Sequence, residues 1–226
     1  MSSKPDHRKV PSWFSVEKAR EAQLHASKHV IRRNMLPEKI RYVAGVDVAY
    51  SKGFSIGAVA VLEYQSLSLV ESGTARLATR FPYIPTLLSF REVSPSVAAI
   101  SKLRLQPDVF LVDGQGIAHP YRFGFASHLG IVINKPTIGV AKSPLTGEVR
   151  QLTRAGWAPI VDKGETVGAA LLTKSGTRPL YVSVGHMVSL KKAVEIVKHC
   201  TLNTRIPTPT LDAHNLATQE KRRNHK

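Results

Sequence analysis

The sequence predicts a single mixed α/β domain, and three observations support this fold class. Short apolar segments with the period of β-strands are interspersed with segments of helical period along most of the chain. No stretch rich in Pro, Gly or Ser interrupts them as an interdomain linker would. A chain of 226 residues, 42% of them hydrophobic, is also long enough to bury about 70% of its unfolded surface.

The two ends of the chain are expected to differ from this domain. Residues 1–40 are rich in Lys and Arg, and the amphipathic stretch from Val16 to Val30 predicts one peripheral helix. The main domain is expected to span residues 41–217. Residues 218–226 form a basic tail without apolar anchors, so we expect it to be flexible, with fraying from Glu220.

The main domain begins with the pattern of three strands. Arg41 to Tyr50 is rich in valine, and Ile56 to Leu62 is a nearly continuous apolar run. Ser66 to Ala78 alternates apolar and polar residues, as a half-exposed strand does.

The period then changes to that of a helix. Ser94 is a good N-cap and Pro95 suits a first turn, so we expect a helix that begins there and ends before Pro107. The apolar run from Asp108 to Val112 predicts a buried strand. The remaining expected elements are helices at Phe123–Leu129 and Val188–His199 and strands at Thr137–Ala141, Thr166–Leu172 and Leu180–Val184.

Composition excludes several classes of protein. The single cysteine, Cys200, rules out a disulfide-built scaffold and a cysteine-based zinc site. No apolar run approaches the roughly 20 residues that span a bilayer, and the N-terminus lacks the apolar core of a signal peptide. We therefore expect a cytoplasmic protein without membrane contact.

The net charge of +16 favours an anionic polymer as the partner. A generic basic surface that aids solubility, or a ribosomal type of binding, would give the same charge, so charge alone does not identify the ligand.

Two aspartates stand at unusual places in apolar runs. Asp47 lies in the middle of a predicted strand, and Asp113 ends another. Burying an unpaired carboxylate costs several kcal/mol, so each needs a cation, a hydrogen-bond donor or a proton. For either one alone, a structural role such as capping a turn is the commoner explanation. Two aspartates on central strands can, however, place oxygen ligands together for Mg²⁺ or Mn²⁺.

Other candidate residues are weaker when each is taken alone. Glu92 stands near a predicted helix start, where an acid also complements the helix dipole. Lys142 directly follows an apolar strand, and His119 and His214 lie in loops or near the C-terminus. A structural role is the commoner explanation for any one of them.

Taken together, six segments resemble the endonuclease V family, in order and over residues 41–214. They are Val43–Asp47, Phe81–Glu92, Pro107–Pro120, Ala126–Gly130, Pro136–Ser143 and Val182–Met187. The segments around Pro82–Pro85 and Asp113–Pro120 are the most specific of these.

The resemblance implies a ribonuclease-H-like fold, a mixed sheet flanked by helices. It also implies a Mg²⁺-dependent nick, with Mn²⁺ as a substitute, in nucleic acid that contains deoxyinosine or inosine. The cut would fall at the second phosphodiester 3′ to the deaminated base and leave 3′-hydroxyl and 5′-phosphate ends. We expect a monomer.

Residue roles carry over from the resemblance position by position. The metal-binding acids would be Asp47, Glu92 and Asp113, and the catalytic set would also include Lys142, which stabilises phosphate charge, and His214. The residues that contact the lesion would be Pro82, Tyr83, Ile84, Pro85, Gly114, Gly116 and His119. Tyr83 would belong to a wedge that pries the strands apart.

The sequence also departs from the family pattern. Thr86 stands where the family usually has glycine, which matters if that position uses a positive φ or a glycine amide. Thr208 and Leu211 replace residues that are commonly acidic and basic, so His214 is the least secure of the site residues and Asp212 is its possible substitute.

Two other functions remain open at this point. A non-catalytic binder would show salt-dependent binding that is indifferent to inosine and no cleavage. A base-excising glycosylase would release hypoxanthine and needs no metal. The sequence does not decide between DNA and RNA substrates.

Overall fold

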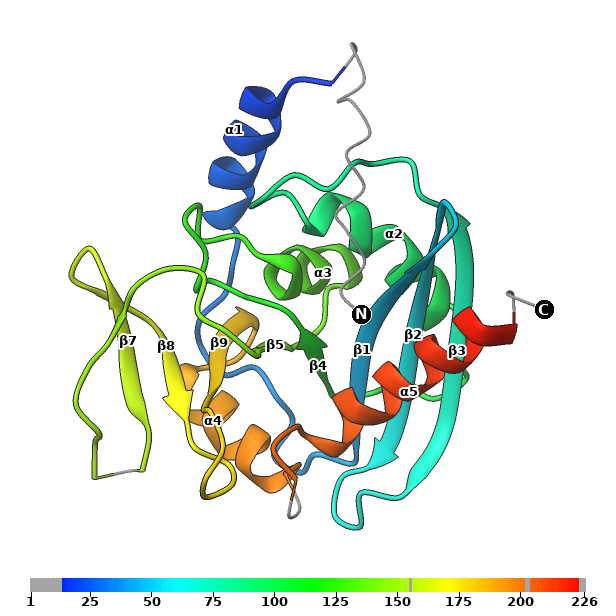
Figure 1. Cartoon of the computed structure of the whole chain (residues 1–226). Helices are drawn as coiled ribbons and strands as arrows, with labels where there is room; N and C mark the ends of the chain where they lie inside the picture. The colour runs from blue at the N-terminus through cyan, green and yellow to red at the C-terminus, as the bar shows by residue number, and fades with distance from the viewer. Residues whose placement is uncertain (1–13, 155, 202–203, 224–226) are drawn as a thin grey trace.

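The computed structural model describes residues 14–154, 156–201 and 204–223. These form one twisted sheet with helices on both sides, drawn in Figure 1. The strands are β1 (Tyr42–Ser51), β2 (Phe54–Glu63), β3 (Leu69–Ala78), β4 (Val109–Asp113), β5 (Thr137–Ala141), β6 (Glu148–Val149), β7 (Ala158–Asp162), β8 (Glu165–Leu171) and β9 (Leu180–His186). The helices are α1 (Val16–Ser27), α2 (Ser89–Ile100), α3 (Phe125–Ile133), α4 (Leu190–His199) and α5 (Thr208–Arg223).

The sheet is mixed, and its parallel part lies at the centre. The strand order is β3-β2-β1-β4-β5-β9-β8-β7-β6. Strand β4 runs parallel to both β1 and β5, and the other neighbouring pairs are antiparallel. Central parallel strands are covered on both faces, which explains the nearly continuous apolar run in β4. The antiparallel strand β2 is also buried along almost its whole length, so both of its faces are apolar. The expected α/β fold with a mixed sheet between helices is confirmed.

Two apolar layers cover the two faces of the sheet. Val43 of β1 packs with α4 and α5, whereas Val46 packs on the opposite face with α2 and α3. Glycines allow two helices to lie directly on the strands. A Cβ at Gly45 would meet the Pro209 carbonyl oxygen of α5 at 1.8 Å, and one at Gly57 would meet the Pro95 carbonyl oxygen of α2 at 2.2 Å. Figure 1 shows α5 crossing β1 and β2.

The peripheral N-terminal helix is confirmed as α1, and one buried side chain attaches it to the domain. Gln23 is fully buried, and its Nε2 donates to the carbonyl oxygens of Thr86 at 2.8 Å and Phe123 at 3.1 Å. Both acceptors belong to connecting segments of the main domain. The N-terminal extension therefore supports the loop that contains Thr86.

Two sequence predictions about helices are wrong. Pro95 does not begin a helix but lies inside α2, which starts at Ser89. Burial of Ser89 and Glu92 keeps the preceding turn helical, and this tertiary packing outweighs the N-cap pattern at Ser94. The frayed end expected from Glu220 is also wrong as far as Arg223, because α5 continues to that residue. Residues 224–226 lie outside the described part of the chain.

The sequence patterns also missed three elements. Strands β6 and β7 are short, and the first of them is exposed. Helix α5 buries mainly small residues, namely Pro209, Thr210, Ala213 and Ala217, so it has no strong apolar stripe. Within the described residues, none of the helices has both the length and the apolar character needed to cross a bilayer.

Candidate active site

Strand register brings Asp47 and Asp113 together. The last aligned pair of the parallel strands β1 and β4 is Val46 with Val112, and each aspartate is the next residue. Alternation along the strands turns both side chains toward the face that α4 and α5 cover, because Val43 and Leu111 pack there. Strand β4 ends at Asp113 while β1 continues, so the two carboxylates meet at the carboxyl edge of the central strands.

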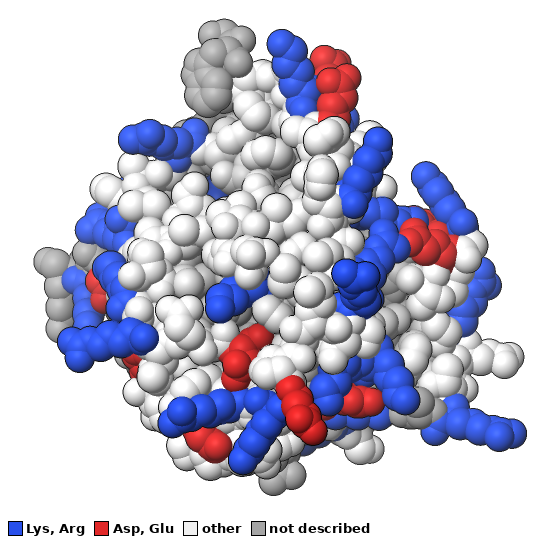
Figure 2. Space-filling view, turned by 180° about the vertical axis from the view of Figure 1, so that it is seen from behind, with Lys and Arg blue, Asp and Glu red and all other residues white. Residues whose placement is uncertain are grey.

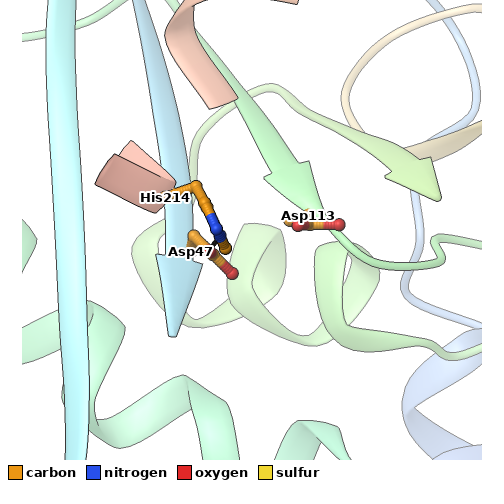
Figure 3. Close-up of side chains that lie close together, drawn as sticks. All are labelled: Asp47, Asp113 and His214. Carbon is orange, nitrogen blue, oxygen red and sulfur yellow. Dashed lines mark hydrogen bonds and ion pairs between the residues drawn. The ribbon is translucent and has the colours of Figure 1, made fainter. Parts of the chain in front are cut away.

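Helix α5 adds His214 to these two acids. The His214 Nδ1 and Asp47 Oδ2 atoms lie 2.7 Å apart. One possible ligand atom from each of Asp47, Asp113 and His214 lies within 4.8 Å of the others. Figure 3 shows the imidazole pointing toward Asp47, with Asp113 at the end of β4. The aspartate side chains are largely buried, at 13% and 18% exposure, whereas His214 is 53% exposed and lies at the mouth of the cluster.

Lys142 contacts the same cluster from the next strand. It directly follows β5, and its Nζ forms an ion pair with Asp113 Oδ2. Burial raises the pKa of Asp113, and the negative charge of Asp47 raises it further, while Lys142 opposes both effects. Two crowded carboxylates in a partly dry environment favour a bound cation, since a cation removes their mutual repulsion.

Glu92 approaches the cluster from the opposite face. It lies on α2, is 7% exposed, and accepts a hydrogen bond of 2.9 Å at Oε1 from the Tyr50 hydroxyl. Burial raises the pKa of Glu92 well above its usual value, and the charges of Asp47 and Asp113 act in the same direction. Glu92 is thus electrostatically coupled to both aspartates, although it is not one of the three residues whose ligand atoms lie within 4.8 Å of one another.

A mainly apolar pocket of about 140 Å³ lies next to the acidic cluster, because Gly114, the residue after Asp113, forms part of its wall. Of the residues expected to contact the lesion, its walls include Tyr83, Ile84, Pro85, Gly114 and His119. Pro82 and Gly116 lie outside the walls. Gly116 instead packs on β9, where a Cβ would meet the Val184 carbonyl oxygen at 2.0 Å.

The loop that forms one wall of this pocket is held at Thr86. Thr86 has φ +73°, a left-handed conformation that β-branched residues rarely adopt. Its carbonyl oxygen lies 3.0 Å from His119 Nε2 and also accepts the hydrogen bond from Gln23. Burial lowers the pKa of His119 to about 4, so the ring is neutral at pH 7. Glycine adopts a positive φ without strain, and a positive φ is the condition under which threonine at this position is expected to matter.

Four further residues near the acids were not singled out by the sequence. Tyr50, Thr218, Lys221 and Arg222 line an open cleft of about 570 Å³ together with Asp47, Asp113, Lys142 and His214. Tyr50 stands three residues beyond Asp47 on the same strand. The other three follow His214 at helical spacing along α5. This spacing could have indicated that they share a face with His214, but the helix was not predicted because the C-terminal segment lacks an apolar stripe.

Comparisons with known proteins show which family this chain resembles. A family model described as Endonuclease V matches residues 24–215. The endonuclease V of Thermofilum pendens is 46% identical over 217 residues, which cover 96% of this chain and 93% of that protein. A crystal structure of endonuclease V from Streptomyces avermitilis is 38% identical with a TM-score of 0.88, covering 96% of this chain and 98% of that one.

A third relative was solved with nucleic acid. The endonuclease V of Ciona intestinalis is 31% identical to this chain, with a TM-score of 0.83. The match covers 92% of this chain and 98% of that one. Its crystal structure contains a 24mer DNA with an inosine followed by a ribo-adenosine. With the match to the family model over most of the chain, these relatives show that the chain belongs to the endonuclease V family and is a nuclease acting on phosphodiester bonds.

Proposed function

We propose that this protein nicks nucleic acid containing deoxyinosine or inosine at the second phosphodiester 3′ to the deaminated base. The reaction is Mg²⁺-dependent, leaves 3′-hydroxyl and 5′-phosphate ends, and serves the repair of deaminated adenine. The observation that carries the proposal is the junction of two sites at adjacent residues. Asp113 belongs to the acidic cluster, and Gly114 forms part of the wall of the apolar pocket. The inosine-containing DNA bound by the Ciona relative supports the same substrate class.

The donor set suits Mg²⁺, with Mn²⁺ as a substitute. Asp47 and Asp113 offer carboxylate oxygens, the ligands that Mg²⁺ prefers, and His214 offers a nitrogen. Glu92 would add a third carboxylate from α2. The raised pKa values of Asp113 and Glu92 reflect burial and mutual repulsion, which a divalent cation would offset. When bound, the cation supplies activation of a water molecule and stabilisation of charge on the leaving oxygen.

The residues around the cluster perform the other steps. Lys142 is 46% exposed, so its ammonium group can reach a phosphate oxygen while it neutralises Asp113. Such a charge stabilises the negative charge that develops on the scissile phosphate. His214 is held by Asp47 through Nδ1, which fixes the imidazole at the entrance to the cluster. All of these residues come from one chain, so a monomer contains the complete proposed site.

The apolar pocket is proposed to receive the deaminated base. Tyr83 is 48% exposed and has Pro82 and Pro85 near it in sequence, so its ring sits on a stiff segment that can enter a base stack. A mispaired inosine is cheaper to unstack than a paired base, which contributes selectivity. His119 is neutral and is engaged with Thr86, so we propose that it shapes the wall of the pocket. Because Gly114 has no side chain, the base can approach the backbone of this wall closely.

The test is a cleavage assay with end-labelled oligonucleotides that contain one deoxyinosine or one inosine. Wild-type protein with Mg²⁺ should give a single nick with a 5′-phosphate, and chelation of the metal should abolish it. Asp113→Ala should abolish nicking and retain binding. Glu148→Gln serves as the control, because Glu148 is an exposed acid, at 76% side-chain exposure, on β6 outside the cluster.

Three outcomes would contradict the proposal. Product formed in the presence of chelator, or by Asp113→Ala at the wild-type rate, would remove the acidic cluster from the reaction. Free hypoxanthine with an abasic site would identify a glycosylase. Salt-dependent binding without any cleavage would identify a binding protein.

A further inference from the structure

The outer face of α5 continues the active-site cleft beyond the acidic cluster. Thr218, Lys221 and Arg222 lie four, seven and eight residues after His214 along the helix. All four residues therefore share one face of α5. All four line the cleft of about 570 Å³ that also contains Asp47 and Asp113. The cleft has no lining residue in common with the apolar pocket, so it is a separate surface.

Lys221 and Arg222 present positive charge to this cleft. Neither forms an ion pair with any residue in the described part of the chain. The next residue, Arg223, differs in both respects. Its Nη1 lies 3.6 Å from Glu220 Oε2, and it lines a different hollow between α5 and β3. Two neighbouring arginines on one helical turn therefore face different surfaces.

The spacing along α5 suits a nucleic-acid backbone. Arg222 lies eight residues after His214, a rise of about 12 Å along the helix, which corresponds to roughly three to four nucleotides of one duplex strand. A strand whose scissile phosphate lies at Asp113 and Lys142 can thus place a phosphate a few nucleotides away at the last turn of α5. Arginine and lysine bind phosphate by charge-assisted hydrogen bonds.

From this geometry we infer that Lys221 and Arg222 form a phosphate-binding site that holds the substrate backbone a few nucleotides from the cut. The inference rests on the proposed function and adds a contact that is independent of the deaminated base. Backbone contacts carry no sequence information. The site therefore strengthens binding to inosine-containing and undamaged strands by the same factor.

The experiment separates this local contact from the general positive charge. Figure 2 shows basic side chains also projecting around the opposite face of the molecule, so loss of any one charge could weaken binding slightly. Arg222→Ala and Arg223→Ala remove the same charge from adjacent positions that face different surfaces. Binding of fluorescent deoxyinosine DNA and of undamaged DNA is measured for both variants, and for Lys221→Ala, over a range of salt concentrations without metal.

We expect Lys221→Ala and Arg222→Ala each to raise Kd by roughly threefold to tenfold on both DNAs, and to reduce the slope of log Kd against log salt by about one. Arg222→Lys should retain most of the affinity, and Arg223→Ala should change Kd by less than about twofold. Thermal unfolding of each variant verifies that the fold is intact.

Equal effects of Arg222→Ala and Arg223→Ala would overturn the inference, as would wild-type affinity in Lys221→Ala and Arg222→Ala. A loss of affinity limited to the inosine strand would also overturn it. Failure of the proposed function would give a different result, because the wild-type protein would then bind DNA and produce no nick. The binding measurements remain decisive in that case, because they do not depend on cleavage.

Discussion

The Tyr50 hydroxyl donates a hydrogen bond of 2.9 Å to Glu92 Oε1, and this bond links β1 to α2 behind the acidic cluster. The phenol is partly buried, and the Arg91 guanidinium lies over its ring at 4.0 Å, so contacts on both sides restrict the position of the hydroxyl. One oxygen of Glu92 is therefore oriented before any cation binds. Partners of this kind, which hold a metal ligand from behind, affect metal affinity in many enzymes.

We predict that Tyr50→Phe raises the Mg²⁺ concentration needed for half-maximal nicking by about tenfold. The ring still fills its site, whereas Glu92 loses the hydrogen bond that orients it. A Mg²⁺ titration of the nicking rate measures the effect. Tyr42→Phe, at the other end of the same strand, is the control and should leave the requirement unchanged. An unchanged Mg²⁺ requirement in Tyr50→Phe would show that the bond has no part in metal binding.

Lys142→Ala is expected to slow nicking by about 100-fold to 1,000-fold at saturating metal. The ammonium group both faces the proposed scissile phosphate and lowers the pKa of Asp113. Its removal should therefore also move the acidic limb of the pH–rate profile to higher pH, because Asp113 then loses its proton less readily. Lys142→Arg should recover part of the rate and restore the acidic limb. A rate loss without any movement of that limb would contradict the coupling to Asp113.

The proximity of Asp47 and Asp113 could be predicted from the sequence, because a charge inside an apolar run requires a partner. Asp47 and Asp113 gave that signal, and strand register then explains why they meet. The contribution of α5 could not be predicted in the same way. Its buried residues are small, and it packs on β1 at Gly45, so no long apolar stripe marks it in the sequence. The Tyr50–Glu92 bond joins two residues that are 42 positions apart in the sequence, which local patterns do not report.

The start of α2 shows the converse limit. Ser94 and Pro95 have the local preference of a helix start, but the chain is already helical from Ser89, where tertiary contacts bury the preceding turn. That displacement matters for the site, since it is the earlier turn that contains Glu92. Local preference is a weak signal wherever a sheet covers the segment.

Thr86→Gly is expected to stabilise the protein by about 1 kcal/mol. A β-branched residue at φ +73° stores about 1–3 kcal/mol of strain, and glycine removes it at an entropic cost of about 0.4–1 kcal/mol. The Thr86 hydroxyl also lacks a hydrogen-bond partner in its buried position, among the described residues. Urea unfolding measures the change.

Thr86→Ala is the matched control for this prediction. It removes the hydroxyl but retains a Cβ at the same positive φ, so it should gain less stability than glycine. Equal stabilities of the two variants would assign the effect to the hydroxyl, and a less stable Thr86→Gly protein would show that the backbone is not strained.

Acid should destabilise the protein through two histidines, His119, which is buried, and His128, which is partly buried. Burial lowers the pKa of both His119 and His128 from 6.5 to about 4. Between these pH values the folded state binds fewer protons than the unfolded state. The contribution of the neutral histidines to the free energy of unfolding is therefore complete above pH 6.5 and is lost as the pH falls toward 4. At pH 5 the loss is about 2 kcal/mol for each histidine.

Urea unfolding of wild-type protein and of His119→Gln at pH 7 and pH 5 tests this origin. In wild-type protein, both histidines contribute to the loss of unfolding free energy between pH 7 and pH 5. In His119→Gln only His128 remains, so this histidine contribution should fall by about half. His25→Gln, at an exposed position on α1, should retain the whole pH dependence. Equal pH dependence in wild type and His119→Gln would mean that His119 is protonated in the folded protein at pH 5, and that its ring does not hold the Thr86 carbonyl in the neutral form.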